Sequence, residues 1–291
     1  IDMSTKKVCV ITGGNNGIGK ETIKLIAKQH PTDLKIILCC RTIQRGEEVV
    51  NEIKEFSNNQ DINVMQLDLS SFQSIRDFVK NFKELGLPLN YLIDCAGVVH
   101  HESTLTADGY EGMFGTNHLG HFLLTNSLLD VMEKSDEPRI TVVSSRAHTS
   151  ANLKLEELPK QPVGFRGYAN SKLCNIMYTY ELQRRLDEKG SKIVVNTLHP
   201  GSVHETELNR SSWIVQKVFP LFAPFITSLR DSAIAVSELS LGERDDLRGV
   251  KGKYFFLREQ YNSNNFSKKP ENWLQLWNKS AEYTGIPSDI Q

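Results

Sequence analysis

The sequence predicts an α/β fold, a doubly wound and mostly parallel sheet of seven strands with helices on both faces. Short apolar runs alternate with longer segments in which apolar residues recur at helical spacing. Every run is followed by a helical segment and then by another run, as the crossovers between parallel strands require. The chain has 291 residues, 39% of them hydrophobic and 24% charged, which suits one large α/β domain.

The expected elements follow one another regularly up to Gly201. We expect strands at 7–12, 34–40, 62–67, 91–95, 139–144 and 192–198. The helices between them are expected at 17–29, 45–56, 71–85, 110–132 and 168–189. Beyond Gly201 we expect a helical substrate lid at about 202–230, a seventh strand near Tyr254 and a last helix at 272–283. Because the sequence has no internal repeat and no long linker, we interpret 1–291 as one domain.

Charge and cysteine content exclude several classes of function. The net charge of −1 offers no electrostatic footprint for nucleic acid. The five cysteines have no metal-ligand spacing and predict free thiols, which suits the cytoplasm or the cytosolic face of a membrane. The first residues, IDMSTKK, lack the pattern of a signal peptide.

The longest apolar stretch, 213–229, has two interpretations. It contains two prolines, a lysine and a glutamine, so we do not expect a membrane-spanning helix. It follows Pro200 and Gly201 closely, which favours a lid over an apolar substrate. Peripheral contact with a membrane surface is the alternative.

A glycine-rich loop follows the first expected strand and opens the first helix. Such a loop lets the backbone approach a pyrophosphate, and the helix N-terminus supplies free N–H groups and a favourable dipole. The alternative is a plain strand-to-helix turn. The glycines have the spacing G-x-x-x-G-x-G, and the cofactor contacts are expected from Gly13, Asn15, Asn16, Gly17, Ile18 and Gly19.

The end of the second strand indicates which nicotinamide cofactor is bound. NAD-binding folds place an acidic residue there, whereas this chain has Arg41 after two cysteines. A guanidinium suits the 2′-phosphate of NADP(H), although Arg41 could also be merely solvated. Asp68 and Leu69 close the third strand, where they are expected beside the adenine; a helix cap at Asp68, Ser70 or Ser71 is the alternative.

Tyr168 and Lys172 form a Y-x-x-x-K pattern on an expected helix. Residues i and i+4 share one helix face, so the phenol and the ammonium would stand side by side. A nearby cation favours the phenolate, and this would bring the pKa of the tyrosine closer to neutral pH. The pair alone is common on exposed helices. Its significance comes from other polar residues at the ends of parallel strands, which share one edge of the sheet: Ser144, Ser145, Asp94 to Gly97, and His199 to Gly201.

Together these motifs resemble the short-chain dehydrogenase/reductase superfamily over nearly the whole chain. The matching blocks are TGGNNGIGKE, CCRTIQRGEE, LDLSS, LIDCAGV, TNHLGHFLLTN, ITVVSSRAH, YANSKLCN and LHPGSV. The chain is most similar to the retinol dehydrogenase branch, and FKELGLPLNYL and SKLCNIMYTYELQRRL also resemble protochlorophyllide oxidoreductase. The interval from Ser145 to Tyr168 is longer than in many family members and close to that of retinol dehydrogenases. It is much shorter than the insertion of protochlorophyllide oxidoreductases, which weighs against that light-driven enzyme.

The resemblance implies a role for each matching residue. Tyr168 would exchange a proton with the substrate oxygen, Lys172 would bind the nicotinamide ribose, and Ser145 would hydrogen-bond the carbonyl. Asn117 would hold a water that links Lys172 to solvent. Further cofactor contacts are implied for Ala96, Gly97, Pro200, Gly201, Val203 and Thr206. The helices that carry Asn117 and Tyr168 would form the interface of a homodimer.

One block departs from the family pattern. The fourth-strand motif usually begins Asn-Asn-Ala-Gly, whereas this chain has Asp94-Cys95-Ala96-Gly97, which leaves the role of Asp94 open. His118 and His121 are three residues apart without an acidic third ligand, so we interpret them as packing residues and expect no metal.

The sequence therefore predicts an NADP(H)-dependent oxidoreductase that acts on a small lipophilic aldehyde, ketone or alcohol, retinoid-like or other. An NADP(H)-binding regulator without turnover is the alternative, because a fold alone does not establish catalysis.

Overall fold

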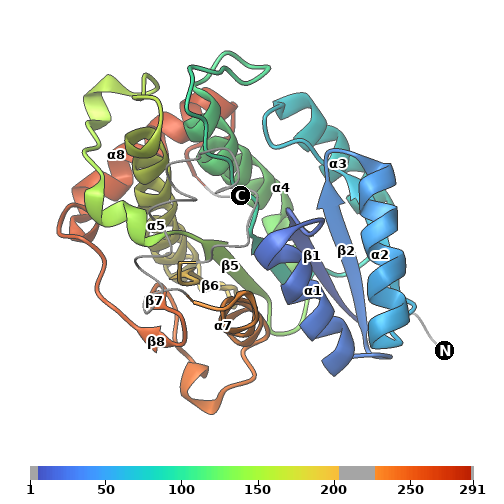
Figure 1. Ribbon diagram of the computed structural model, residues 1–291. Helices are drawn as coiled ribbons and strands as arrows, with labels where there is room; N and C mark the ends of the chain where they lie inside the picture. Colours follow the sequence, from blue (N-terminus) through green and yellow to red (C-terminus); the bar gives the residue numbers. More distant parts are fainter. Residues whose placement is uncertain (1–5, 203–226, 290–291) are drawn as a thin grey trace.

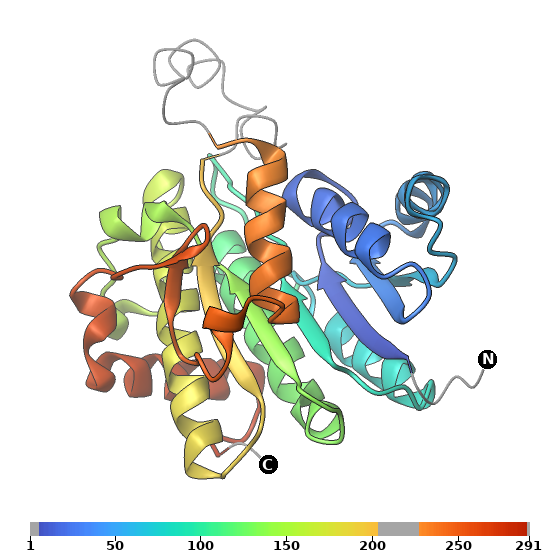
Figure 2. The same ribbon diagram turned by 90° about the horizontal axis from the view of Figure 1, so that it is seen from below.

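The computed structural model describes residues 6–202 and 227–289, and these form one eight-stranded sheet with helices on both faces (Figures 1 and 2). The strand order is β3-β2-β1-β4-β5-β6-β7-β8. Every pairing is parallel except that of β7 with β8. The predicted doubly wound α/β class is confirmed.

The strands are short, and the helices between them are mostly three to four turns long. The strands are β1 (Lys7–Thr12), β2 (Leu34–Cys40), β3 (Ile62–Gln66), β4 (Tyr91–Asp94), β5 (Arg139–Val143), β6 (Val194–His199), β7 (Tyr254–Phe256) and β8 (Glu259–Gln260). The main helices are α1 (Gly17–Gln29), α2 (Ile43–Ser57), α3 (Phe72–Glu84), α4 (Gly120–Met132), α5 (Phe165–Glu188), α7 (Leu229–Leu241) and α8 (Pro270–Thr284).

Two features differ from the sequence-based expectation. The sheet has an eighth strand, the two-residue β8, whose exposed residues carry no period-2 pattern that would predict it. The expected helix at 110–132 is divided into a π-helical segment, η2 (Phe114–Leu119), and α4. Gly120 lies at this junction, and a Cβ there would approach the Leu69 carbonyl oxygen to 2.4 Å, so the helix is packed closely against the segment that follows β3.

Side chains of the central strands alternate between two hydrophobic cores, as expected for a sheet buried on both faces. Val8 and Val10 face the core formed with α3, α4, α5 and α8. Cys9 and Ile11 face the core formed with α1, α2 and α7. The two helix layers hold the strands in register and leave the carboxyl ends of the strands as the edge where polar side chains gather.

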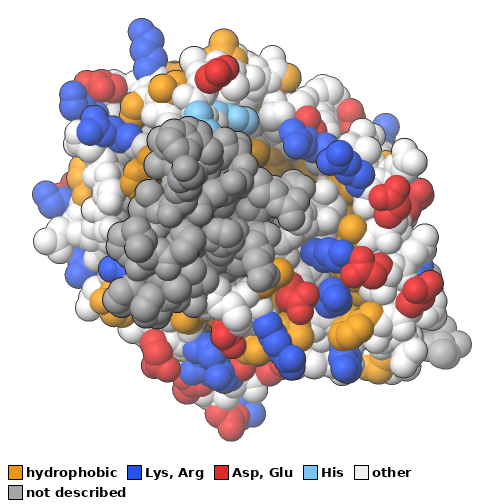
Figure 3. Space-filling view, viewed as in Figure 1, with side chains coloured by type: hydrophobic (Ala, Val, Ile, Leu, Met, Phe, Trp, Pro, Cys, Tyr) orange, Lys and Arg blue, Asp and Glu red, His pale blue; other side chains and the backbone are white. Residues whose placement is uncertain are grey.

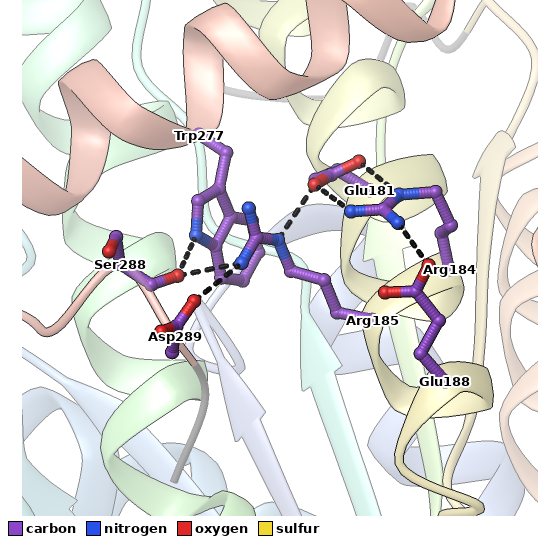
Figure 4. Close-up of polar contacts among 7 residues, drawn as sticks. All are labelled: Glu181, Arg184, Arg185, Glu188, Trp277, Ser288 and Asp289. Carbon is purple, nitrogen blue, oxygen red and sulfur yellow. Dashed lines mark hydrogen bonds and ion pairs between the residues drawn. The ribbon is translucent and has the colours of Figure 1, made fainter.

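The C-terminal helix α8 closes the outer side of the first layer by packing against α5. Trp277 is 1% exposed and lies between Phe122 and Tyr178, at ring-centroid distances of 4.9 Å and 5.9 Å. Its indole nitrogen donates to the Ser288 carbonyl at 2.7 Å, and Arg185 donates to the same oxygen, so the chain after α8 is fastened to α5 (Figure 4).

Basic and acidic side chains are interspersed on the face shown in Figure 3, which agrees with the formal net charge of −1. Within the described ranges, no helix is long and apolar enough to cross a bilayer.

Candidate active site

A cleft of about 1060 Å³ lies at the carboxyl ends of the parallel strands. Open α/β folds bind their ligands at this edge, where the chain passes from strands to loops and helix N-termini. The cleft brings together almost all the residues that the sequence singled out. Its lining includes Gly13, Asn15, Asn16, Gly17, Ile18, Gly19, Arg41, Asp68, Leu69, Ala96, Gly97, Ser145, Tyr168, Lys172, Pro200 and Gly201.

Three predicted residues are not in this lining. Asn117 is buried behind the cleft, where it contacts the loop that follows β4. Val203 and Thr206 lie outside the described residues, as does most of the predicted lid. The ends of that segment meet beside the cleft, because Thr227 donates its N–H to the Ser202 carbonyl at 2.9 Å.

The loop between β1 and α1 has the shape that a pyrophosphate requires. Gly13 has φ +68°, and a Cβ there would lie 2.9 Å from Ala96 Cα. A Cβ at Gly19 would approach the Gly13 carbonyl oxygen to 2.4 Å, so the loop folds tightly over the start of α1. Asn16 caps α1 by accepting from the Gly17 N–H at 2.7 Å, and the first turn holds no acidic side chain. This cradle fits the diphosphate of a nicotinamide dinucleotide.

Two arginines lie where the adenosine end of a dinucleotide would be held. Arg41 follows β2 and is exposed, and Arg45 lies in the first turn of α2; both line the cleft. The sequence analysis identified Arg41 but missed Arg45, although a second arginine four residues after the first was a usable signal.

Asp68 had two interpretations, a residue beside the adenine and a helix cap, and the structure shows that it does not cap α3. Its carboxylate accepts from the N–H and the hydroxyl of Ser70, at 2.9 Å and 2.7 Å. The cap of α3 is Ser71, which accepts from the Ser74 N–H. Asp68 therefore stabilises the turn before α3, and this turn places Asp68 and Leu69 on the wall of the cleft.

Tyr168 and Lys172 lie one turn apart near the start of α5, and both line the cleft. The Lys172 ammonium donates to the Val143 carbonyl at 2.9 Å and lies 5.9 Å from the centre of the Tyr168 ring. Burial lowers the pKa of Lys172 to about 8, although Cys95 and Asp94 favour its charged form. Burial raises the pKa of Tyr168, and a hydrogen bond with Ser145 opposes that rise. The two groups thus share a desolvated site in which small changes of charge shift protonation.

The neighbouring serines have different hydrogen-bond partners. Ser144 donates to the Lys172 carbonyl at 2.7 Å and so joins β5 to α5. Ser145 accepts from the Ala147 N–H at 3.2 Å, and its hydroxyl lies beside Tyr168 in the cleft.

The side chain of Asn117 is fully used in holding the loop after β4. Its amide oxygen accepts from the Val98 N–H at 2.7 Å, and its amide nitrogen donates to the Val98 carbonyl and to Ser171 Oγ at 3.0 Å. Ser171 in turn donates to the Tyr168 carbonyl at 2.8 Å. Asn117 thereby connects the loop to Ser171 in the second turn of α5.

Asp94, the departure from the family pattern, is completely buried at the end of β4. One carboxylate oxygen accepts from the Thr125 hydroxyl at 2.8 Å, and the other has no hydrogen-bond partner among the described residues. Burial raises the pKa of Asp94 to about 7, against the opposing effects of Thr125 and Lys172. Asp94 thus places a titratable acid behind the cleft.

Two histidines belong to this region: His199 was predicted at the end of the sixth strand without a role of its own, and no role in the site was predicted for His121. His199 ends β6, is 4% exposed and lines the cleft, and its ring stacks on Phe256 at 5.2 Å. His121 was interpreted as a packing residue, but its ring hydrogen-bonds Thr12 at the end of β1. No spacing in the sequence signals that contact, because 109 residues separate the two partners.

The family model for short chain dehydrogenase matches residues 7–216. The chain belongs to the short-chain dehydrogenase/reductase family. Within it, the chain lies on the retinol dehydrogenase branch: it is 37% identical to human retinol dehydrogenase 11 over 291 residues, covering 97% of this chain and 87% of that protein. It is 36% identical to mouse retinol dehydrogenase 12 over 282 residues and 34% identical to human polyprenol dehydrogenase over 286 residues, each covering 96% of this chain and 87% and 86% of those proteins.

Solved structures share the fold of this chain. A putative uncharacterized protein from Mycobacterium paratuberculosis superposes with a TM-score of 0.69 at 26% identity, covering 97% of this chain and 94% of that one. A short-chain dehydrogenase/reductase mutant from Serratia marcescens shares the fold, with a TM-score of 0.66 at 21% identity, covering 87% of this chain and 97% of that one. The family member described here is therefore an oxidoreductase that uses a nicotinamide cofactor and acts on CH–OH or carbonyl groups.

Proposed function

We propose that the chain is an NADP(H)-dependent oxidoreductase that interconverts a lipophilic alcohol with its aldehyde or ketone. The observation that carries this proposal is the placement of Tyr168, Lys172 and Ser145 in one cleft with a glycine cradle and two arginines. The nicotinamide supplies or accepts the hydride, so the protein must orient the reactants and move one proton.

Each residue of the proposed mechanism has one task in carbonyl reduction. Ser145 donates a hydrogen bond to the substrate oxygen and polarises the carbonyl, and Tyr168 delivers its phenolic proton to that oxygen as the hydride reaches the carbon. The products are the alcohol and a tyrosinate, which is reprotonated from solvent. Lys172 contributes the positive charge that stabilises the tyrosinate and holds the nicotinamide ribose. Alcohol oxidation is the reverse, with tyrosinate as the base.

A tyrosine substitution tests the mechanism. Tyr168→Phe removes one hydroxyl and should lower turnover about 10²–10⁴-fold while leaving cofactor binding intact. The matched control is Tyr180→Phe on the same helix, which removes a hydroxyl that contacts Ser263, away from the cleft. Near-normal activity of Tyr168→Phe would contradict the mechanism. Cofactor binding by the wild-type protein without turnover of any aldehyde or alcohol would favour the regulator instead.

The choice of NADP(H) over NAD(H) rests on Arg41 and is supported by Arg45. Among the described residues that line the cleft, Asp68 alone is acidic, and its carboxylate is engaged by Ser70. The arginines are therefore not paired there with an acidic side chain that would take the place of a 2′-phosphate. Arg41→Asp should narrow or reverse the preference for NADPH over NADH measured by calorimetry. Arg248→Asp, at an exposed site outside the cleft, makes the same change of charge and should leave the preference unchanged. Equal affinity of the wild-type protein for both cofactors would contradict the proposal.

The lipophilic substrate class is supported by the cleft mouth and by the relatives. Leu105 and Phe165 line the cleft although they are 70% and 62% exposed, so apolar surface faces an incoming ligand. The relatives are dehydrogenases of retinol and of polyprenol by name. We keep the lid at about 202–230, within one domain of residues 1–291, as part of this proposal. A panel of aldehydes of increasing chain length should show kcat/KM rising with apolar area; a preference for short polar aldehydes would contradict it.

The assembly and location are further parts of the proposal. The family resemblance predicts a homodimer through the helices that carry Asn117 and Tyr168, although α8 of the same chain packs against α5 and η2. Light scattering at high micromolar concentration decides: the mass of two chains supports the dimer, and the mass of one contradicts it. The free cysteines support a reducing location, the cytoplasm or the cytosolic face of a membrane to which the protein binds peripherally.

A further inference from the structure

His121 lies in the first turn of α4, is 1% exposed, and uses both nitrogens of its ring. Nε2 lies 2.9 Å from the Thr12 hydroxyl at the end of β1. Nδ1 lies 3.0 Å from the Asn117 carbonyl oxygen in η2. The imidazole therefore bridges the first strand of the sheet and the π-helical turn that carries Asn117.

The hydrogen-bond partners of Thr12 determine the direction of this bridge. The hydroxyl oxygen accepts the N–H groups of both Cys95 and Ala96 at 2.9 Å, and these fill its two lone pairs. Its own hydrogen is then free to donate to Nε2 of His121, at a shorter distance than the 3.5 Å to the Ile93 carbonyl. Nδ1 must carry the proton of the neutral ring and donates it to the Asn117 carbonyl. Burial lowers the pKa of His121 to about 4, which keeps the ring neutral.

The two partners of His121 hold the same loop from opposite ends. Thr12 holds the N–H groups of Cys95 and Ala96, and Asn117 holds both backbone polar groups of Val98. Gly97 lies between the two anchors, and a Cβ there would be 3.3 Å from the Lys172 ammonium. The position of this loop therefore determines how closely its backbone approaches Lys172 and the nicotinamide side of the cleft.

We propose that His121 is a positioning residue that ties Thr12 to Asn117 and so fixes the loop 95–98 against Lys172. The inference rests on the proposed function for its catalytic consequence, whereas the fixing of the loop is a property of the protein without ligands. Of the two hydrogen bonds of His121, the one to Thr12 is essential for fixing the loop, because the bond to Asn117 joins residues four apart in the chain.

The chain offers a matched control in His118. It is equally buried, lies three residues earlier, packs among Phe114, Phe122 and Tyr178, and contacts Ser280 of α8 at 2.8 Å. Neither its hydrogen bond nor its aromatic contacts among the described residues involve the loop 95–98. His118→Phe therefore removes one buried imidazole and its hydrogen bond without touching the bridge.

Hydrogen–deuterium exchange of the unliganded protein tests the bridge directly. In His121→Phe the amides of Cys95 and Ala96 should exchange at least about tenfold faster than in the wild type, the effect of one lost buried hydrogen bond. In His118→Phe these amides should keep the wild-type rate. Unchanged exchange in His121→Phe, or equal acceleration in both variants, would overturn the inference. Since the measurement needs no cofactor, its outcome is separate from any failure of the proposed oxidoreductase activity.

Two conservative variants keep the proposal testable if His121→Phe does not fold. His121→Gln retains an acceptor that reaches Thr12, and His121→Asn retains a donor to the Asn117 carbonyl. The glutamine variant should keep slow exchange at Cys95 and Ala96 and bind NADPH roughly tenfold more tightly than the asparagine variant. A glutamine variant that behaves no better than the asparagine variant would overturn the inference.

Discussion

Both ends of α5 carry a buried ionisable side chain, but only the one near the C-terminal end is paired with opposite charges. At the C-terminal end Glu181 is 1% exposed and is fully paired: it accepts from Arg184 at 2.7 Å and 2.9 Å and from Arg185 at 2.7 Å (Figure 4). These bonds raise the pKa of Arg184. At the N-terminal end Lys172 is 3% exposed, and its only hydrogen bond to a described residue is to the neutral Val143 carbonyl.

The difference separates structural charge from chemical charge on one helix. The paired cluster is fixed in its ionic form and fastens α8 and the following chain, since Arg185 also stacks on Trp277 at 4.5 Å. Lys172 and Tyr168 are desolvated without such paired charges. Burial therefore lowers the pKa of Lys172 and raises the pKa of Tyr168, which favours the neutral form of each. We therefore expect a bound ligand to change the protonation of Tyr168 and Lys172 but not of the paired groups.

The largest expected effect is a loss of turnover in a variant that still folds. Ser145→Ala removes the hydroxyl beside Tyr168 and should lower turnover by about 10²–10³, as expected for a positioned donor to a developing oxyanion. Ser144→Ala is the matched control, because it removes the hydroxyl that joins β5 to the Lys172 carbonyl. It should cost about 1 kcal/mol of unfolding free energy and lose less turnover. Steady-state kinetics and denaturant unfolding of both variants check the contrast, and a reversed ranking of turnover would contradict it.

The paired cluster should show the opposite response. Glu181→Gln removes the charge that both arginines share and should cost about 2 kcal/mol of unfolding free energy, less than for a fully buried pair because Arg184 is partly exposed. Turnover per folded molecule should stay near the wild-type value. Denaturant unfolding measured beside steady-state kinetics checks this, and a loss of turnover at full stability would place Glu181 in the chemistry.

Asp94 sharpens the comparison through a smaller, pH-dependent effect. Its pKa rises from 3.8 to about 7 on folding, so the folded state is favoured with the proton bound and loses stability as the pH rises through 7. Asp94→Asn retains an acceptor for Thr125 and carries no charge. It should therefore stabilise the protein by about 2–3 kcal/mol more at pH 8 than at pH 5, because stability is lost between about pH 4 and pH 7. Thermal unfolding at the two pH values measures the difference, and a gain that is equal at both would contradict the assignment.

The sequence predicted the sheet and most of the cleft because both depend on local patterns. Apolar runs such as Val8 to Ile11 and the glycine loop after Thr12 are readable from a few adjacent residues. The contacts it missed join distant segments: Thr12 with His121, and Trp277 with Arg185. The expectation that Lys172 lowers the pKa of Tyr168 depends on a balance between charge and burial, and the structure shows burial raising the pKa of Tyr168.

The coupling of Lys172 to Tyr168 is the central claim, and the pH–rate profile of alcohol oxidation tests it most directly. Oxidation needs the tyrosinate, so the acid limb of the profile reports the pKa of Tyr168 in the working site. Lys172→Met removes the neighbouring positive charge and should shift that limb to higher pH, because the tyrosinate loses its stabilising cation. Lys189→Met, an exposed lysine at the end of the same helix, should leave the limb in place. A Lys172→Met profile that coincides with the wild-type profile would contradict the account.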